Sequence, residues 1–289
     1  MNGSLALFLA ATLYGFIGVF SRIISFNIPL FFQAWSRNVL AVLLIFGLVK
    51  IFGGWKKLKP GDFKWFALRG LGGFISFLAF YISFIYLDFS TTYFISYAAA
   101  TIAGYLLGYL FFKEKLNQVK LISLGLSIIG LFLIFRVNLN LDKSIYLVLS
   151  AVGGITLSIW TVFSKKISGI YSNLQMNLID SIFALAFPLS LSLILREQWS
   201  WPTLSWLWGA NLLFACLFIA VGFLIVYGFK KVEAQKGSLI LLFDIVVGIL
   251  LGLILFKENV SLPALMGGAL IVAAMIFPNI NLKELSKNE

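Results

Sequence analysis

Three ionisable side chains stand inside long apolar runs of this chain, and their chemistry most needs an explanation. Arg37, Asp180 and Asp244 each lie about eight residues into such a run, which corresponds to about 12 Å along a helix. Placing one charged side chain at the centre of an apolar span costs at least about 2.5–3.5 kcal/mol. Each of the three therefore requires either a partner or a functional role.

Arg37 and Asp180 occupy matching positions, 143 residues apart, in the two halves of the chain. They could form a direct or water-bridged ion pair that joins the halves, because a buried charge without a partner is worse than a paired one. They could instead act as a clamp for a zwitterion, with Arg37 binding a carboxylate and Asp180 an amine. Both interpretations stay open at the level of sequence.

Asp244 has no charged counterpart, since the matching position in the first half is Ala100. A carboxylic acid without a symmetry-related partner in a span can bind a substrate cation or exchange a proton. The alternative is a carboxyl group held by neighbouring serine or threonine side chains. We expect Asp244 to belong to a binding site.

Aromatic and hydroxyl side chains deep in the runs could form the wall of a solute pocket. The alternative for each of them is helix packing. The candidates are Tyr14, Tyr81, Tyr97, Trp160, Ser96 and Thr101.

The composition identifies the medium around these residues as lipid. Of 289 residues, 61% are hydrophobic and only 11% are charged, against about 25% charged in a soluble domain. Continuous rather than alternating apolar runs predict helices and exclude a barrel. We expect an all-α integral membrane protein with ten transmembrane helices. The runs cover approximately residues 4–22, 28–50, 65–87, 90–112, 118–137, 144–165, 172–195, 204–229, 236–256 and 261–280.

The ten runs divide into two similar sets of five. Phe112-Lys113-Glu114 recurs as Phe256-Lys257-Glu258, and Gly104 and Gly108 recur at the same offset as Gly248 and Gly252. Collinear matches at one spacing indicate a duplication, with repeats at 1–140 and 141–289. Because five is odd, the second copy enters the membrane from the opposite side, so the repeats are inverted.

The repeated glycines have a spacing that places bare backbone on one helix face. Gly104 and Gly108, like Gly248 and Gly252, are four residues apart. Such a face lets helices approach closely where lipid removes the hydrophobic drive for association. We expect helix packing at these four positions, with lining of a pathway as the alternative.

The chain has a net charge of +11, and the positions of its lysines and arginines indicate which side of the membrane each connection occupies. When connections are assigned to alternate sides, most of the 22 lysines and arginines fall on the side of the N-terminus, which predicts that both termini are cytoplasmic. This distribution argues against a nucleic-acid partner. No histidine is present and Cys216 is the single cysteine, so we expect no metal site, no cofactor and no catalytic histidine.

Several stretches resemble the drug/metabolite transporter superfamily, EamA type. The two repeat ends around Glu114 and Glu258 resemble its helix-end pattern, "ATLYGFIGVFSR" resembles its first helix, and "GGITLSIWTVFSKK" its sixth. Arg37 resembles an arginine of its second helix. The position of Asp244 is often acidic in that family, and helices one, three, four and six line its cavity. Its usual prolines are replaced here by Thr101 and Ile245, so a helix break is not expected there.

The resemblance and the inverted repeats together imply a secondary transporter rather than an enzyme. The expected activity is export of a small organic metabolite, such as an amino acid, by alternating access in the plasma or inner membrane. Protons are the candidate coupling ion, since no phosphate-binding loop for ATP is present. The alternatives are a membrane-embedded enzyme and a structural or sensory membrane protein. The solute, the coupling mode and the choice between monomer and homodimer stay open.

Overall fold

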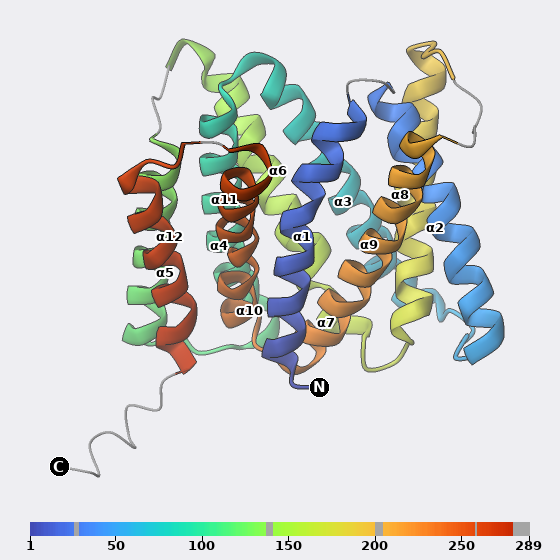
Figure 1. Cartoon of the computed structure of the whole chain (residues 1–289). Helices are drawn as coiled ribbons and strands as arrows, with labels where there is room; N and C mark the ends of the chain where they lie inside the picture. The colour runs from blue at the N-terminus through green and yellow to red at the C-terminus, as the bar shows by residue number, and fades with distance from the viewer. Residues whose placement is uncertain (26–28, 137–140, 200–204, 258, 280–289) are drawn as a thin grey trace. The chain divides into compact units, whose positions relative to one another are not determined.

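The computed structural model describes residues 1–25, 29–136, 141–199, 205–257 and 259–279, and every regular element within them is helical (Figure 1). The elements in chain order are α1 (Gly3–Ser25), α2 (Leu30–Phe52), α3 (Pro60–Tyr86), α4 (Phe89–Phe112), α5 (Gln118–Phe135), η1 (Leu141–Lys143), α6 (Ser144–Val162), α7 (Ser164–Ile167), α8 (Asn173–Ile194), α9 (Trp206–Lys231), α10 (Ala234–Leu241), α11 (Phe243–Phe256), α12 (Leu262–Ile276) and η2 (Phe277–Asn279).

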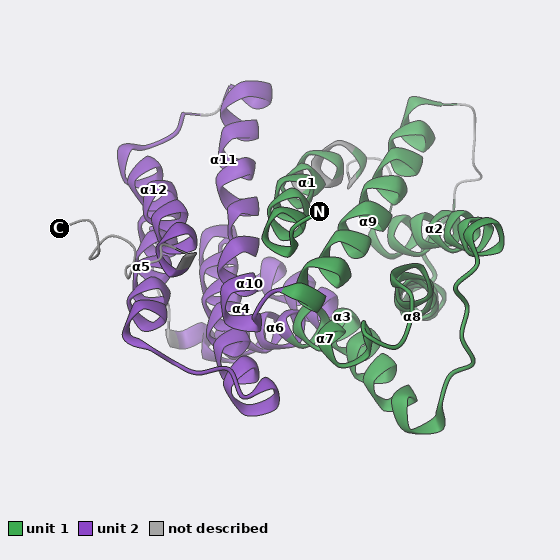
Figure 2. Cartoon of the chain, turned by 90° about the horizontal axis from the view of Figure 1, so that it is seen from below, with its two compact units in different colours: residues 1–75, 159–231 green, residues 76–158, 232–289 purple. Residues whose placement is uncertain are grey.

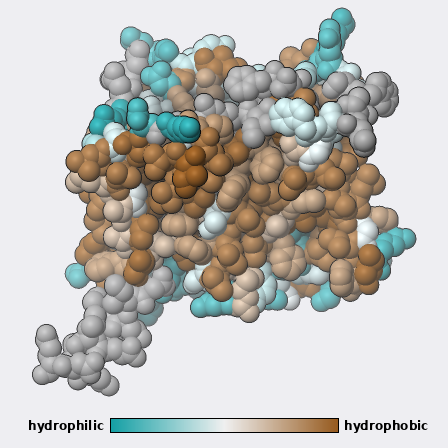
Figure 3. Space-filling model, viewed as in Figure 1, coloured by the Kyte–Doolittle hydropathy of each residue, from teal (hydrophilic) through white to brown (hydrophobic). Residues whose placement is uncertain are grey.

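Eight helical segments of the described chain are long and apolar enough to cross a bilayer, and two shorter apolar helices begin and end the series. Ser144–Ile167 combines α6 with α7, and Ala234–Phe256 combines α10 with α11. Apolar side chains cover most of the face seen in Figure 3, with hydrophilic ones at its upper and lower margins. The expectation of an all-α membrane protein is confirmed.

The chain divides into two compact units, coloured separately in Figure 2. Unit 1 contains Met1–Ile75 and Ile159–Lys231, and unit 2 contains Ser76–Ser158 and Val232–Glu289. Two of the boundaries run through α3 and α6, and the third lies between α9 and α10. Each unit therefore combines helices from both predicted repeats, 1–140 and 141–289, because packing joins helices that are far apart in sequence.

In unit 1, the second helix of one repeat packs against the second helix of the other, and the two run antiparallel. At one end of this α2–α8 pair, the Lys56 backbone N–H donates to Gln175 Oε1 at 3.0 Å. At the other end, Glu197 accepts backbone N–H bonds from Phe31 at 3.1 Å and Phe32 at 2.7 Å. Glu197 therefore occupies the positive N-terminus of α2 and fixes it to the chain that follows α8.

In unit 2, the fifth helices of the two repeats also run antiparallel. A methyl group placed on Gly130 of α5 would lie 2.7 Å from the Gly267 carbonyl oxygen of α12. The reciprocal methyl on Gly267 would strike the Gly130 carbonyl, and it would also crowd Ile134. Only glycine permits this approach of two backbones.

The fourth helices of the two repeats, α4 and α10–α11, form a second antiparallel pair within unit 2. Gly104 lies against Ser238, while Tyr97, earlier in α4, bonds to Asp244, later in the partner segment. The later residue of α4 therefore contacts the earlier residue of α10–α11, which means that the two segments run antiparallel. Together with the two pairs above, this arrangement makes the architecture one of ten helices in two inverted five-helix repeats.

The repeated Phe-Lys phrase is a repeated helix end. Lys113 ends α4 with φ 55°, and Lys257 ends α11 with φ 52°, which are both left-handed conformations unusual for lysine. Their backbone N–H groups bond to the carbonyls of Gly108 and Gly252, respectively. The match in sequence therefore reflects one cap geometry used twice. Glu258, the last residue of the second phrase, lies outside the described residues.

Candidate functional site

The ninth membrane span is interrupted beside Asp244. One helix, α10, ends at Leu241, and the next, α11, begins at Phe243. Around this break, the Leu242 N–H donates to the Leu239 carbonyl, and the Ile245 N–H donates to the Leu242 carbonyl, each at 3.2 Å. Asp244 thus lies in the first turn of α11, where the helix dipole favours a negative charge. No break was expected here, because the usual proline is absent; a 3₁₀-type turn produces the break instead.

Asp244 is buried, with 7% of its surface exposed, and one of its two carboxyl oxygens accepts a side-chain hydrogen bond. The Tyr97 hydroxyl donates to Asp244 Oδ2 at 2.6 Å, and the Tyr97 ring stacks on Tyr93 at a centroid distance of 5.6 Å. Asp244 Oδ1 has no hydrogen-bond partner among the described residues. The carboxyl group is therefore held by a tyrosine rather than by serine or threonine neighbours, and it keeps one acceptor position open.

The two predicted hydroxyl residues make local bonds that account for their burial. Ser96 is fully buried and lies 2.9 Å from both the carbonyl and the hydroxyl of Ser150 on α6. The Thr101 hydroxyl donates to the Tyr97 carbonyl at 2.8 Å, one turn earlier in α4. The first contact joins α4 to α6, and the second is a back-bond within the helix.

The remaining predicted aromatics lie in different units. Tyr81 is half-buried on α3 in unit 2, the unit that contains Asp244 and Tyr97. Tyr14, half-buried on α1, and Trp160 on α6 belong to unit 1. Within one unit, the structure thus brings together Asp244 and Tyr97 but not the whole predicted set.

Asp180 is paired with Arg69, and among the residues that the structure describes no direct ion pair joins it to Arg37. The Arg69 guanidinium donates to Asp180 Oδ2 and also to the Trp160 carbonyl at 2.6 Å. The Trp160 indole N–H donates to the same Asp180 oxygen at 3.3 Å. Side-chain exposure is 1% for Arg69 and 11% for Asp180. The three residues thus form a buried polar network of α3, α6 and α8.

The sequence did not identify Arg69 as the partner of Asp180. The apolar run that contains Arg69 begins at about residue 65, so this arginine was counted among the cations at the membrane surface. In the structure α3 begins at Pro60, which puts Arg69 well inside the helix. A buried acid on a neighbouring span was the signal that could have identified it.

Arg37 lies over aromatic rings. Its guanidinium carbon is 4.1 Å from the ring centroid of Phe214 and 5.2 Å from that of Phe218, both on α9. Cation–π contacts of this kind stabilise a cation away from water by about 2 kcal/mol. They give Arg37 a structural role that requires no carboxylate.

The four repeated glycines differ in their surroundings. A methyl group on Gly104 would strike the Ser238 side chain, and one on Gly108 would lie 2.6 Å from Glu114 Oε2. At Gly248 nothing lies within 4 Å, so close packing within the described residues does not account for that glycine. Gly252 is buried and supplies the carbonyl for the Lys257 cap.

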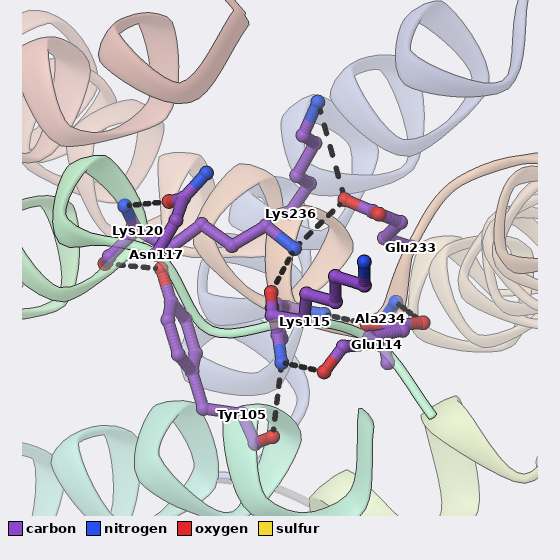
Figure 4. Close-up of polar contacts among 9 residues, drawn as sticks. Tyr105, Glu114, Lys115, Asn117, Lys120, Glu233, Ala234 and Lys236 are labelled. Carbon is purple, nitrogen blue, oxygen red and sulfur yellow. Dashed lines mark hydrogen bonds and ion pairs between the residues drawn. The ribbon is translucent and has the colours of Figure 1, made fainter. Parts of the chain in front are cut away.

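Glu114, the last residue of the first repeated phrase, is buried at 8% exposure. Its carboxylate accepts backbone N–H bonds from Ala234 at 2.7 Å and Gln235 at 3.1 Å (Figure 4). It therefore caps the N-terminus of α10, the half-helix that leads to the break at Leu242. Within the described ranges, no group of three or more His, Cys, Asp or Glu side chains could hold a metal ion.

Comparison with known proteins agrees with this architecture. Over 178 residues, the chain is 29% identical to "Uncharacterized transporter YoaV" from Bacillus subtilis (strain 168), and the match covers 58% of each chain. It therefore spans less than two thirds of that relative. An "Uncharacterized transporter" from Clostridium kluyveri is 28% identical over 76% of this chain and 73% of its own length.

Solved structures also share the fold, and one of them is a crystal structure. It aligns with a TM-score of 0.82 over 96% of this chain and 98% of its own, at 14% sequence identity. The sequence also matches the EamA-like transporter family twice, over residues 1–136 and again over residues 144–280. The two matches coincide with the two inverted sets of five helices, and the chain therefore belongs to the EamA-like transporter family.

Proposed function

We propose that this membrane protein is a secondary carrier that exports a small organic solute bearing an amine, such as an amino acid, by alternating access. Membership of a transporter family supports transport as the activity. Inverted repeats support alternation, because near-equivalent halves make inward-open and outward-open states similar in energy. We place both termini in the cytoplasm, on the distribution of lysine and arginine.

The observation that carries the proposal is the carboxyl group of Asp244. It is buried beside a break in a membrane span, its Oδ2 accepts from Tyr97, and its Oδ1 has no hydrogen-bond partner in the described part of the chain. An ammonium group or a proton satisfies that oxygen, whereas an anion would be repelled. Irregular backbone at membrane depth is also characteristic of sites that receive a solute.

The test is a flux assay in liposomes over a panel of amino acids and amines, with and without a pH gradient. A charge-assisted hydrogen bond contributes about 1.5–3 kcal/mol, so Asp244→Asn should weaken the apparent affinity for an amine by about 10- to 150-fold. The same variant should lose any response of flux to the pH gradient. Tyr97→Phe keeps the acid but removes its donor, so we expect a smaller loss.

Asp88→Asn is the matched control, because Asp88 is an exposed acid in unit 2 and undergoes the same chemical change. Full, gradient-dependent flux in Asp244→Asn would remove Asp244 from the site. Product turnover by the purified protein without a gradient would favour the enzyme alternative. Absence of flux for every amine tested would contradict the proposed solute class.

A further inference from the structure

A polar pocket of about 230 Å³ opens in unit 2 where three helices begin or end. Its wall includes Lys115 and Asn117 before α5, Lys236 in the first turn of α10, and Pro278 just after α12. Figure 4 shows Lys120 and Lys236, from separate helices, joined by dashed lines to the Glu233 carboxylate, with Lys115 and Asn117 nearby. The pocket thus lies at the ends of membrane spans, where the apolar region meets water.

The charge of the pocket is positive. Lys115, Lys120 and Lys236 line it, and among the described residues Glu233 is the one acid in its wall. The Lys120 ammonium is buried, donates to the Lys115 carbonyl at 2.8 Å and lies 3.1 Å from Glu233 Oε2. Glu233 therefore neutralises one of three cations, mainly Lys120, and leaves an excess of two.

The other two ammonium groups are available to an anion. Lys236 is 4.0 Å from Glu233 Oε2, a long contact to an oxygen that Lys120 already holds. Lys115 is exposed, and its ammonium contacts no acid within the described ranges. Lysine binds phosphate as a mobile point charge, so both side chains can close on one anionic group.

Exposed apolar residues continue from the pocket along the spans. Leu121, directly after Lys120, is 52% exposed, and Ile122 is 51% exposed. On the antiparallel α12, Ile276 is 48% exposed two residues before Pro278. A molecule that placed a phosphate among the lysines could therefore lay hydrocarbon chains on α5 and α12.

We propose that this pocket binds the phosphate of an anionic phospholipid, whose acyl chains lie against the exposed faces of α5 and α12. The site is separate from Asp244 in chemistry, because it selects an anion. It also adjoins Glu233 and Lys236 at the start of α10, the half-helix that leads to the break beside Asp244. Bound lipid therefore holds the base of that half-helix.

The experiment measures lipid binding directly and requires no transport. The purified full chain in detergent is titrated with phosphatidylglycerol or phosphatidylcholine, and bound lipid is counted by native mass spectrometry. We expect the protein to prefer phosphatidylglycerol. Each lysine near a membrane surface contributes about 1 kcal/mol to the binding of an anionic lipid. The double variant Lys115→Gln with Lys236→Gln should therefore bind phosphatidylglycerol about 30-fold more weakly. Glu233→Gln should strengthen this binding.

The control is Lys57→Gln with Lys64→Gln, which removes two exposed cations in unit 1 and gives the same net charge. An equal loss of lipid in the control pair would show attraction by net charge alone and overturn the site. Equal binding of the two lipids would overturn it as well. If inorganic phosphate binds but phosphatidylglycerol shows no advantage, a soluble anion occupies the pocket and the lipid assignment is wrong.

Discussion

Replacing Asp180 by leucine should destabilise the protein strongly, and replacing Arg69 at the same time should restore most of the loss. In the single variant, the Arg69 guanidinium keeps its bond to the Trp160 carbonyl but loses its counter-ion. Breaking a buried ion pair by removing one partner costs about 3–5 kcal/mol, because the remaining charge is uncompensated.

The double variant Arg69→Met with Asp180→Leu removes both charges. Two contacts of Trp160 are lost with them, since its indole N–H loses the Asp180 oxygen 3.3 Å away and its carbonyl loses the Arg69 donor 2.6 Å away. A buried polar group left without a partner costs about 1–3 kcal/mol, and removing the desolvation cost of both charges offsets part of this loss. The double variant should therefore be about 1–3 kcal/mol less stable than the native protein, and more stable than Asp180→Leu alone.

The measurement is the free energy of unfolding of all four proteins, obtained by titration with sodium dodecyl sulfate in mixed micelles. The interaction energy of the cycle should be about 2 kcal/mol or more, in the range expected for residues in direct contact. A second cycle combines Asp180→Leu with Arg37→Met. Its two effects should add, because Arg37 lies over Phe214 and Phe218 instead.

Additive effects in the Arg69 cycle would refute the ion pair, since independent sites do not couple. Strong coupling in the Arg37 cycle would restore the inter-repeat pair that the matching sequence positions suggest. The two cycles share the Asp180→Leu protein, so the comparison does not depend on how well that variant is expressed.

Two further predictions concern packing and capping. Gly267→Ala should destabilise the protein by about 1–3 kcal/mol, because its methyl would strike the Gly130 carbonyl. Gly248→Ala has open space around the new methyl and should change stability by less than about 0.5 kcal/mol. Thermal unfolding in detergent compares the two variants, and equal shifts of their unfolding temperatures would contradict the geometry. Glu114→Gln should cost about 1–2 kcal/mol, because a neutral amide replaces a carboxylate on two backbone N–H groups at the positive end of α10. Hydrogen exchange should rise in α10 first, and unchanged exchange there would show that the cap is dispensable.

The features visible in sequence are those that lipid enforces locally. Backbone hydrogen bonds must be satisfied inside each span, so apolar runs of sufficient length predict helices, and an odd number of them predicts inversion. The helix ends at Lys113 and Lys257 were also visible in the sequence, because the same backbone geometry occurs with the same Phe-Lys residues in both repeats.

The partners of buried polar residues were harder to predict, because they depend on how each helix is rotated. Matching depth made Arg37 a plausible partner for Asp180, yet Arg69 on α3 reaches it. Glu114 stands between two lysines in the sequence, yet it is buried and accepts a hydrogen bond from the start of α10. Asp244 was predictable as a rare acid in a span, whereas its bond to Tyr97 required the three-dimensional structure.

The antiparallel contact of α2 with α8 has a consequence for synthesis. The partners are separated by about 140 residues, which a ribosome adds in about 7–30 s at 5–20 residues per second. During that interval the polar residues of α2 that are buried in the finished protein, including Gln33, Ser36 and Asn38, lack both α8 and α9, and Ser36 lacks the Asn211 amide of α9 that donates to it at 3.3 Å. The first half of the nascent chain must therefore wait in the bilayer, and a chaperone or insertase that shields polar helix faces would act during that wait.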